Sequence, residues 1–454
     1  MSQLDLPLRQ AKPILVSCRR EKYLFYTADT REVAVVDSAG KGVWDCFDTP
    51  TTPRKVMRHK AVSHADPAQQ LRDMATMVDL LLEKGFLVAA DQDAAVEDEA
   101  PPPPSPDENP LRSLYIHMTD RCNLQCIYCY NQGYRESTGK LQELDMDTLR
   151  QLLDDAAELS VKSVVFTGGE PLLRRESIEA ANYARKLGIK TTCLTNGSLL
   201  TRRAGEAAKA FDQIVVSFDS WVAEENERIR VGCQPERIST GIRDMVESGV
   251  DVTIRPVITK HNVESMAGFP EWAERELGCT SFQPALCSPI SADDIGLLDF
   301  LPSLESYRQA KQGFKRALKT LGKGNKRELP TKTRTAQCGA GTGMLSIAPN
   351  GDVFPCQCLH IDGKAAGNLH QQPLEAIWRT SPVLAQFRQE RTEPFSACHD
   401  CAVQGLCTLN CRAIYDAFRS EEKTFTDAMC RYAAVEIEDQ LWREADRLAA
   451  LDGN

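Results

Sequence analysis

Long apolar runs and an excess of positive charge are both missing from this sequence of 454 residues. No run approaches the roughly 20 apolar residues that a membrane-spanning helix needs. The first residues lack the basic-then-apolar order of a secretory signal peptide, so we expect a cytoplasmic protein with no membrane partner. The formal net charge is −10. This balance argues against nucleic acid as the main partner, because phosphate binding needs clustered Lys and Arg.

Cysteine, in contrast, is abundant. The chain has 17 cysteines, and 42% hydrophobic with 26% charged residues is an ordinary composition for a globular protein of two to four domains. In a reducing compartment thiols stay free of disulfides, so this count points toward metal ligands.

Three thiols gather in one short stretch. Cys122, Cys126 and Cys129 follow the pattern Cys-x3-Cys-x2-Cys, directly after the apolar residues 114–118. The spacing suits an iron–sulfur cube that keeps one iron unligated by protein. A structural zinc loop is the alternative, but zinc needs a fourth ligand close by, and the next cysteine is Cys193. We call residues 121–130 the cysteine loop.

This motif, with Tyr128 before its last cysteine, resembles the signature of the radical S-adenosylmethionine (SAM) enzymes. The resemblance implies that the open iron of a [4Fe-4S] cluster chelates SAM. An electron from the cluster then cleaves SAM to a 5′-deoxyadenosyl radical. It also implies a flavodoxin- or ferredoxin-type electron donor.

Strand-like and helix-like segments alternate after the cysteine loop. We expect strands at residues 114–118, 163–166, 191–194, 214–217, 253–257 and 281–284, with amphipathic helices at 146–159 and 177–187 among the segments between them. This α/β order resembles the partial (βα)6 barrel of the radical SAM enzymes. Functional residues are then expected at the carboxyl ends of the strands.

Family-like motifs follow these expected strands. Gly168, Gly169 and Glu170 come after the second strand; their glycines allow a close backbone approach to a ligand, and the glutamate matches the residue that binds the amino group of SAM. Asn196 resembles the ribose-contacting segment, and Ser217 is expected to face the ribose or the carboxylate.

The next family landmark, His-Asp-x-x-Arg-Gly, is poorly kept. The corresponding segment is 226–231, in which only Arg230 aligns as the guanidinium that would hold the SAM carboxylate. Arg228 is the alternative, and either arginine could instead be a solvated helix charge.

Seven later cysteines and Gly351 match the pattern of the SPASM domain, which marks radical SAM maturases of peptides and proteins. By this resemblance Cys398, Cys401, Cys407 and Cys430 hold a distal auxiliary [4Fe-4S] cluster, and Cys338, Cys356 and Cys411 hold a proximal one. A zinc ribbon would need two complete sets of four ligands, and only one short Cys-x2-Cys pair is present. We expect the crossed ligation to staple a domain that is otherwise poor in long helices.

The fourth ligand of the proximal cluster is missing from its usual place. Cys358 could complete the set, Cys287 could reach in, or one iron could stay open for a substrate thiolate or solvent. We favour the open site.

The first ninety residues predict three short strands, then helices, then a closing apolar run. The order resembles a RiPP recognition element, a winged-helix-like α+β domain that binds a leader peptide along a strand edge. A small structural or oligomerisation domain is the alternative.

Domain boundaries follow from composition. We expect the leader-binding domain at 1–90, an acidic, proline-rich linker at 91–110, the partial barrel at 111–325 and the SPASM domain at 326–454.

Together these features predict a maturase of a ribosomally made precursor peptide, bound through its leader. Hydrogen abstraction from the core peptide would lead to an intramolecular thioether or carbon–carbon cross-link. One rival is a sulfatase-maturing enzyme that makes formylglycine, which has no obvious need for the first ninety residues. The other is a non-catalytic iron–sulfur carrier or peptide-binding protein, which has no use for the carboxylate of Glu170.

Overall fold

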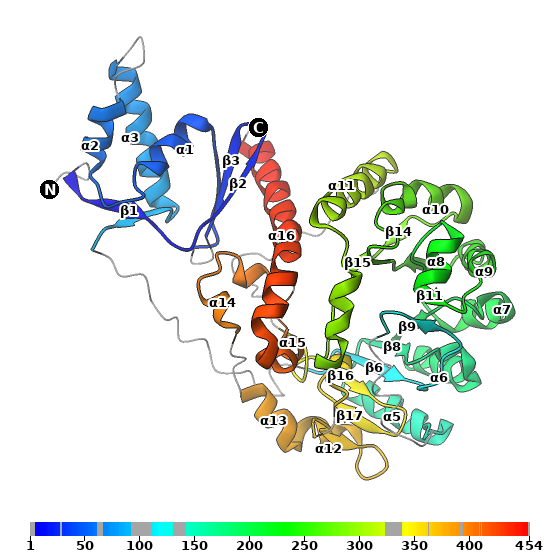
Figure 1. The fold of residues 1–454 in the computed structure, drawn as a ribbon. Coiled ribbons are helices and arrows are strands. Elements are labelled where there is room, and N and C mark those ends of the chain that lie inside the picture. The colour runs from blue at the N-terminus through cyan, green and yellow to red at the C-terminus, as the bar shows by residue number, and fades with distance from the viewer. Residues whose placement is uncertain are drawn as a thin grey trace.

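The computed structural model describes residues 5–27, 30–60, 67–91, 110–129, 142–322, 338–361, 363–389, 394–407, 409 and 411–452. Of the expected linker, 91–110, only residues 91 and 110 are among the described residues. Within the described part of the chain, no helix is long and apolar enough to cross a membrane. Figure 1 shows an N-terminal unit on one side of the long helix α16 and a sheet flanked by helices on the other.

The N-terminal unit has the predicted order of strands and helices. Its three-stranded antiparallel sheet has the order β2-β3-β4, and a second pair joins β1 to β5. The elements are β1 (Leu8–Gln10), β2 (Leu15–Arg19), β3 (Lys22–Tyr26), β4 (Val33–Val36), α1 (Ser38–Asp45), α2 (Pro53–Lys60), α3 (Pro67–Glu83) and β5 (Leu87–Ala89). Strand β1 was not predicted, because three residues are too short to show an alternation.

The middle strand of this sheet is covered on both faces. Phe25 packs into the core under α1 and α3, whereas Leu24 and Tyr26 pack against Leu441 and Trp442 of α16 (Glu422–Asp452). Successive side chains of a strand point to opposite faces, so this arrangement fixes the register of β3. The N-terminal unit is therefore docked on the C-terminal helix.

The central part of the chain contains the predicted parallel strands. Six of them lie in the order β6-β8-β9-β10-β12-β14, all parallel. They are β6 (Ser113–His117), β8 (Ser163–Thr167), β9 (Lys190–Thr195), β10 (Gln213–Val216), β12 (Asp251–Ile254) and β14 (Ser281–Phe282). The partial-barrel fold is confirmed, and the carboxyl ends of these strands share one edge.

Helices cover one side of this sheet (Figure 1). They are α5 (Met146–Glu158), α6 (Arg175–Lys186), α7 (Leu200–Ala210), α8 (Ala223–Ile229), α9 (Pro235–Glu247), α10 (Phe269–Leu277) and α11 (Leu304–Thr320). This part is completed by four short strands and three 3-10 turns: β7 (Gln125–Cys126), β11 (Arg230–Val231), β13 (Val257–Ile258), β15 (Ala285–Leu286), η2 (Pro171–Leu173), η3 (Ser265–Gly268) and η4 (Ala292–Phe300).

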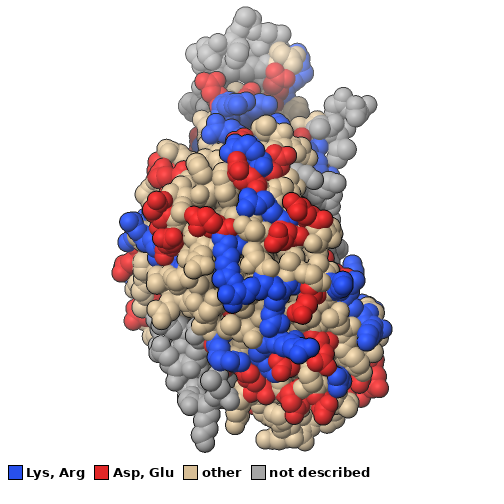
Figure 2. Space-filling view, turned by 90° about the vertical axis from the view of Figure 1, so that its right-hand side faces the viewer, with Lys and Arg blue, Asp and Glu red and all other residues tan. Residues whose placement is uncertain are grey.

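On the side of the molecule shown in Figure 2, Lys and Arg side chains form a band between acidic ones.

The sheet continues into the C-terminal third, which the sequence did not predict. Strand β16 (Met344–Ile347) lies parallel to β6, and β17 (Asp352–Phe354) and β18 (Gly367–Asn368) extend the sheet in antiparallel fashion. The other elements are η5 (Gln357–Leu359), α12 (Leu374–Thr380), α13 (Pro382–Gln389), α14 (Ser396–His399), η6 (Gln404–Leu406), α15 (Arg412–Phe418) and η7 (Arg419–Glu421).

The expectation that this domain is poor in long helices is wrong, because α16 has 31 residues. The helix contacts the N-terminal sheet on one side and α11 on another, where Tyr307 binds Glu436 and Lys315 binds Asp439. Its apolar residues therefore do not form a single stripe. A single apolar stripe is the sequence pattern that identifies a surface helix.

Candidate functional site

The predicted motifs meet at the carboxyl edge of the parallel strands. The cysteine loop follows β6, Glu170 follows β8, Asn196 follows β9, and Ser217 follows β10. Such an edge is where loops from several strands converge in α/β enzymes.

A short strand holds the cysteine loop against the segment of Arg230. Cys126 in β7 pairs with Arg230 in β11, and Ile127 N donates to Ile229 O at 3.0 Å. Burial raises the pKa of Cys126 to about 11; Arg230 opposes this shift, while Cys129 and Cys122 add to it. The three thiols therefore lie close enough to act on one another.

These thiols are not arranged around a single ion. Within the described residues, no group of three or more His, Cys, Asp or Glu side chains is spaced to hold one metal ion. A cube is bound differently, because each thiolate takes its own iron. Three neighbouring, half-buried thiols beside a guanidinium fit such a group.

The two glycines before Glu170 approach the chain's own backbone. A Cβ on Gly169 would lie 2.2 Å from Arg121 O, and one on Gly168 would lie 2.4 Å from Thr119 O. Gly169 N donates to Thr119 O at 2.7 Å, and Glu170 N donates to Arg121 O at 2.8 Å. The glycines thus place the end of β8 directly against the start of the cysteine loop.

The carboxylate of Glu170 is fully buried and already accepts three hydrogen bonds. Oε1 accepts from Leu172 N at 3.0 Å and from Thr195 Oγ1 at 2.8 Å, and Oε2 accepts from Asn196 N at 2.7 Å. Burial raises the pKa of Glu170, and these hydrogen bonds oppose the shift. Glu170 therefore joins the ends of β8 and β9; a contact with SAM stays a prediction.

Asn196 lies beside the cysteine loop. Its Nδ2 donates to Asn123 Oδ1 at 3.0 Å and approaches Cys122 Sγ at 3.7 Å. Ser217 is half-buried at the end of β10, where its backbone N donates to Thr195 O at 3.0 Å. Both residues occupy the predicted edge, and their contacts with SAM stay predictions.

A buried group of three side chains was not predicted as a unit. Tyr128 Oη donates to Asp219 Oδ2 at 2.5 Å, Arg230 Nη1 donates to Tyr128 Oη at 2.7 Å, and Arg230 Nη1 lies 3.6 Å from Asp219 Oδ2. Burial raises the pKa of Asp219, and the charge of Arg230 opposes this shift. Sequence reasoning missed Asp219; its place at the end of the strand was the available signal.

The same group changes the picture of Arg230. This side chain is only 4% exposed, and its Nε has no hydrogen-bond partner among the described residues. One end of the guanidinium thus fastens the cysteine loop, and a donor remains. The predicted grip on the SAM carboxylate stays a prediction.

The proximal thiols form a set of four. A hydrogen bond with Cys358 raises the pKa of Cys356, and the charge of Cys338 adds to that shift. Burial raises the pKa of Cys411, and the charges of Cys358 and Cys338 add to it. Cys358 thus lies among the three predicted ligands.

Cys287 lies elsewhere. Burial raises its pKa to about 12, and its charged neighbours are Asp219 and Asp294. Cys358, unlike Cys287, therefore lies with the predicted proximal ligands; the fourth ligand of the proximal cluster stays a prediction.

The distal thiols also lie together. Burial raises the pKa of Cys430 to about 11, and the charges of Cys407, Cys398 and Cys401 add to it. Cys401 and Cys407 also pack against the apolar group that joins the N-terminal sheet to α16. The distal set thus borders the N-terminal unit.

Two histidines connect the two halves of the site. His117, the last residue of β6, packs against His360 with ring centroids 4.4 Å apart and ring planes tilted by 44°, and His360 lies two residues after Cys358. Both ring nitrogens of His117 are buried without a partner among the described residues. This pair could not be predicted, because the two residues are far apart in the chain.

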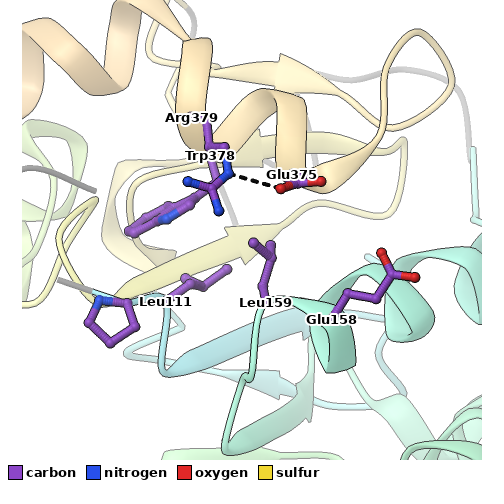
Figure 3. A pocket seen from close by; sticks show the side chains of 7 residues that line it. Leu111, Glu158, Leu159, Glu375, Trp378 and Arg379 are labelled. Atoms are coloured by element: carbon purple, nitrogen blue, oxygen red, sulfur yellow. Dashed lines mark hydrogen bonds and ion pairs between the residues drawn. The ribbon is translucent and has the colours of Figure 1, made fainter. Parts of the chain in front are cut away.

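A surface pocket of about 230 Å³ lies at the opposite end of β6. Figure 3 shows its lining, in which Leu111 precedes the strand, Leu159 follows α5, and Arg379 pairs with Glu375 at 2.9 Å. This end of the strand is remote from the cysteine loop, so the pocket is not part of the candidate site.

Two segments match known families. Residues 116–273 match the Radical SAM superfamily, and residues 338–402 match the SPASM iron–sulfur cluster-binding domain. A PqqA peptide cyclase of Gluconobacter oxydans is 30% identical, over 64% of this chain and 83% of its own. An AdoMet-dependent heme synthase of Methanosarcina barkeri is 28% identical, over 67% of this chain and 92% of its own.

Solved structures share the fold. SuiB of Streptococcus suis bound to S-adenosylmethionine matches with a TM-score of 0.54 at 17% identity, covering 89% of this chain and 96% of that chain. SuiB has also been solved bound to the precursor peptide SuiA. anSMEcpe with bound AdoMet and a peptide matches with a TM-score of 0.56 at 18% identity, covering 75% of this chain and all of that chain.

Proposed function

This chain belongs to the radical SAM superfamily and carries a SPASM domain, and from that premise we propose that it modifies a ribosomally synthesised precursor peptide. The observation that carries the proposal is the N-terminal unit, docked on α16 beside the distal thiols. The family assignment makes the chain a SAM-cleaving enzyme. The peptide substrate is our inference.

The N-terminal unit offers a way to bind an extended leader. Among the described residues, β4 pairs only with β3, so its other edge has unpaired backbone groups that could add a peptide strand. A peptide cyclase among the relatives, and the fold shared with SuiB over 89% of the chain, support this reading. We propose residues 1–90 as the leader-binding domain, 111–325 as the barrel and 326–454 as the SPASM domain.

The cofactors follow from the family, and we propose their ligands. Cys122, Cys126 and Cys129 would hold the SAM-binding [4Fe-4S] cluster, which supplies a 5′-deoxyadenosyl radical when SAM is bound. We propose two auxiliary [4Fe-4S] clusters: a distal one on Cys398, Cys401, Cys407 and Cys430, and a proximal one on Cys338, Cys356, Cys358 and Cys411.

The residues around the cysteine loop would position SAM. Glu170, Asn196 and Ser217 line the carboxyl edge, and Arg230 keeps one donor for a carboxylate. Tyr128 and Asp219 fix the guanidinium of Arg230, so that its remaining donor is preoriented. A flavodoxin- or ferredoxin-type protein is the proposed electron donor, and a thioether or carbon–carbon cross-link is the proposed product.

A sulfatase-maturing function is the alternative of the same chemistry. It would keep the barrel and the SPASM thiols, and it has no evident need for the N-terminal unit. anSMEcpe, solved with AdoMet and a peptide, is matched over its whole length by only 75% of this chain. The additional N-terminal unit therefore favours a substrate with a leader.

The test uses the reconstituted, reduced full chain and synthetic peptides that correspond to any short open reading frames next to its gene. We expect 5′-deoxyadenosine, a mass decrease of the peptide, and slower amide exchange in β4 when the leader is present. A control peptide without its leader should give no protection and little product. Unchanged peptide mass, with deoxyadenosine still formed, would contradict the proposed substrate class and leave sulfatase maturation or heme-synthase chemistry to be assayed.

A further inference from the structure

The parallel strands have two different faces. Ile116, Phe166, Ile214 and Ile254 belong to the core that the helices cover, together with their alternating neighbours on each strand. The intervening residues, such as Tyr115, point to the opposite face. A substrate at the carboxyl edge would approach the strands from this helix-free face.

Arg255 continues the helix-free face at the end of β12. The backbone stays extended there, because Arg255 N donates to Val216 O at 2.8 Å, as in the parallel ladder. Its neighbours Ile254 and Pro256 are buried, whereas Arg255 is exposed. The hydrogen bond also places Arg255 beside Ser217, at the level of the predicted SAM contacts.

The charge of Arg255 also reaches β6 across the sheet. Burial raises the pKa of Tyr115 on β6, and Arg255 opposes that shift. The guanidinium of Arg255 therefore lies within electrostatic reach of the Tyr115 side chain.

Among the described residues, Arg255 has no acidic partner. Its side chain makes no ion pair and no hydrogen bond within the part of the chain that the structure describes, in contrast to Arg230. A guanidinium that faces an enzyme's reaction space without a counter-charge is suited to bind a planar anion with two parallel hydrogen bonds.

We propose that Arg255 binds a carboxylate of the substrate. Resting on the proposed function, the substrate class is a core peptide with an Asp or Glu side chain, or its C-terminal carboxylate, next to the residue attacked. The site lies at the carboxyl edge of the strands beside Ser217, within electrostatic reach of Tyr115. This contact would fix which peptide residue faces the radical.

The test measures carboxylate binding without turnover, so it does not depend on processing. The probes are acetyl-Gly-Gly-Glu-Gly-Gly-amide and the two peptides that carry Gln or Lys in place of Glu. Their binding to the reconstituted full chain with SAM is measured by saturation-transfer NMR. We expect the Glu peptide to bind about tenfold better than the Gln peptide, and Arg255→Gln to remove this preference. Arg255→Glu should reverse it in favour of the Lys peptide, which a misfolded variant could not do.

Arg275→Gln is the matched control, because Arg275 is an exposed arginine of the outer helix α10 that pairs with Glu276. It should leave the preference for the Glu peptide unchanged. Equal binding of the Glu and Gln peptides to the unsubstituted protein would overturn the proposal. So would an Arg255→Gln variant that keeps the preference and instead needs more SAM for deoxyadenosine formation, because the guanidinium would then serve the cofactor.

Discussion

At the scale of single residues, polar groups at the strand ends bind one another before they bind any ligand. Glu170 satisfies two backbone donors and one hydroxyl, and Asp219 is bound by Tyr128 and by Val257 N at 2.9 Å. Buried carboxylates are stable only when such donors surround them. These contacts hold the edge in shape, and they explain why loss of one member should disturb its neighbours.

The lowered pKa of His117 predicts that the local stability of β6 depends on pH. Burial lowers this pKa from 6.5 to about 4, so the folded chain does not take up a proton in a range where the unfolded chain does. The contribution of neutral His117 to the free energy of unfolding is therefore complete above about pH 6.5. It is lost as the pH falls toward 4, which lowers the free energy of unfolding by on the order of 3 kcal/mol. We expect amide protection factors in β6 to fall over this window, and His117→Leu to abolish that part of the decrease. An equal decrease in the variant would contradict this role.

At the scale of elements, the contact between the end of β8 and the cysteine loop is the most important one for the candidate site. The backbone N–H groups of Gly169 and Glu170 donate its hydrogen bonds. A side chain at either glycine position would collide with the facing backbone. From the sequence we expected these glycines to permit a close backbone approach to a ligand. The sequence could not indicate that the approaching group is the backbone of residues 119–121, because that depends on the parallel pairing of β6 with β8.

Gly169→Ala should therefore damage the SAM-binding cluster selectively. The new Cβ would lie 2.2 Å from Arg121 O, so the cysteine loop must shift, at a cost of about 1–3 kcal/mol or more. We expect the reconstituted variant to lose about one third of its iron and nearly all deoxyadenosine formation, while both auxiliary clusters remain. Gly205→Ala is the control, since a Cβ in that helix meets nothing within 4 Å. Full iron content in Gly169→Ala would show that the loop tolerates the shift.

At the scale of the whole molecule, α16 joins all three parts of the chain. It contributes Cys430 to the distal set, contacts α11 through Glu436, and carries the N-terminal sheet on Trp442. Trp442 Nε1 donates to Ser17 Oγ at 2.8 Å, and Arg19 lies over its ring at 5.4 Å. The N-terminal unit, the barrel helix α11 and the distal thiols are thus joined through one helix.

Trp442→Ala should uncouple the N-terminal unit from the rest of the enzyme. Loss of this buried ring removes about 3–5 kcal/mol of packing at the contact, so amide exchange in β3 should accelerate. Cleavage of SAM without peptide should stay near its normal rate, while processing of a precursor should fall. Trp221→Ala serves as the control, because Trp221 is 42% exposed. Normal precursor processing by Trp442→Ala would mean that docking on α16 is dispensable.

The sequence by itself determined the local chemistry and the order of elements. The spacing of Cys122, Cys126 and Cys129, the expected strands and the later cysteines needed only neighbours along the chain, and the predicted fold class is confirmed. Tertiary structure decided what depends on distant segments: the pairing of β16 with β6, the length and two-sided burial of α16, the place of Cys358 among the proximal thiols, and the place of Arg255 beside Ser217. Side-chain periodicity reports one buried face at a time, whereas these contacts join surfaces that meet only after the chain has folded.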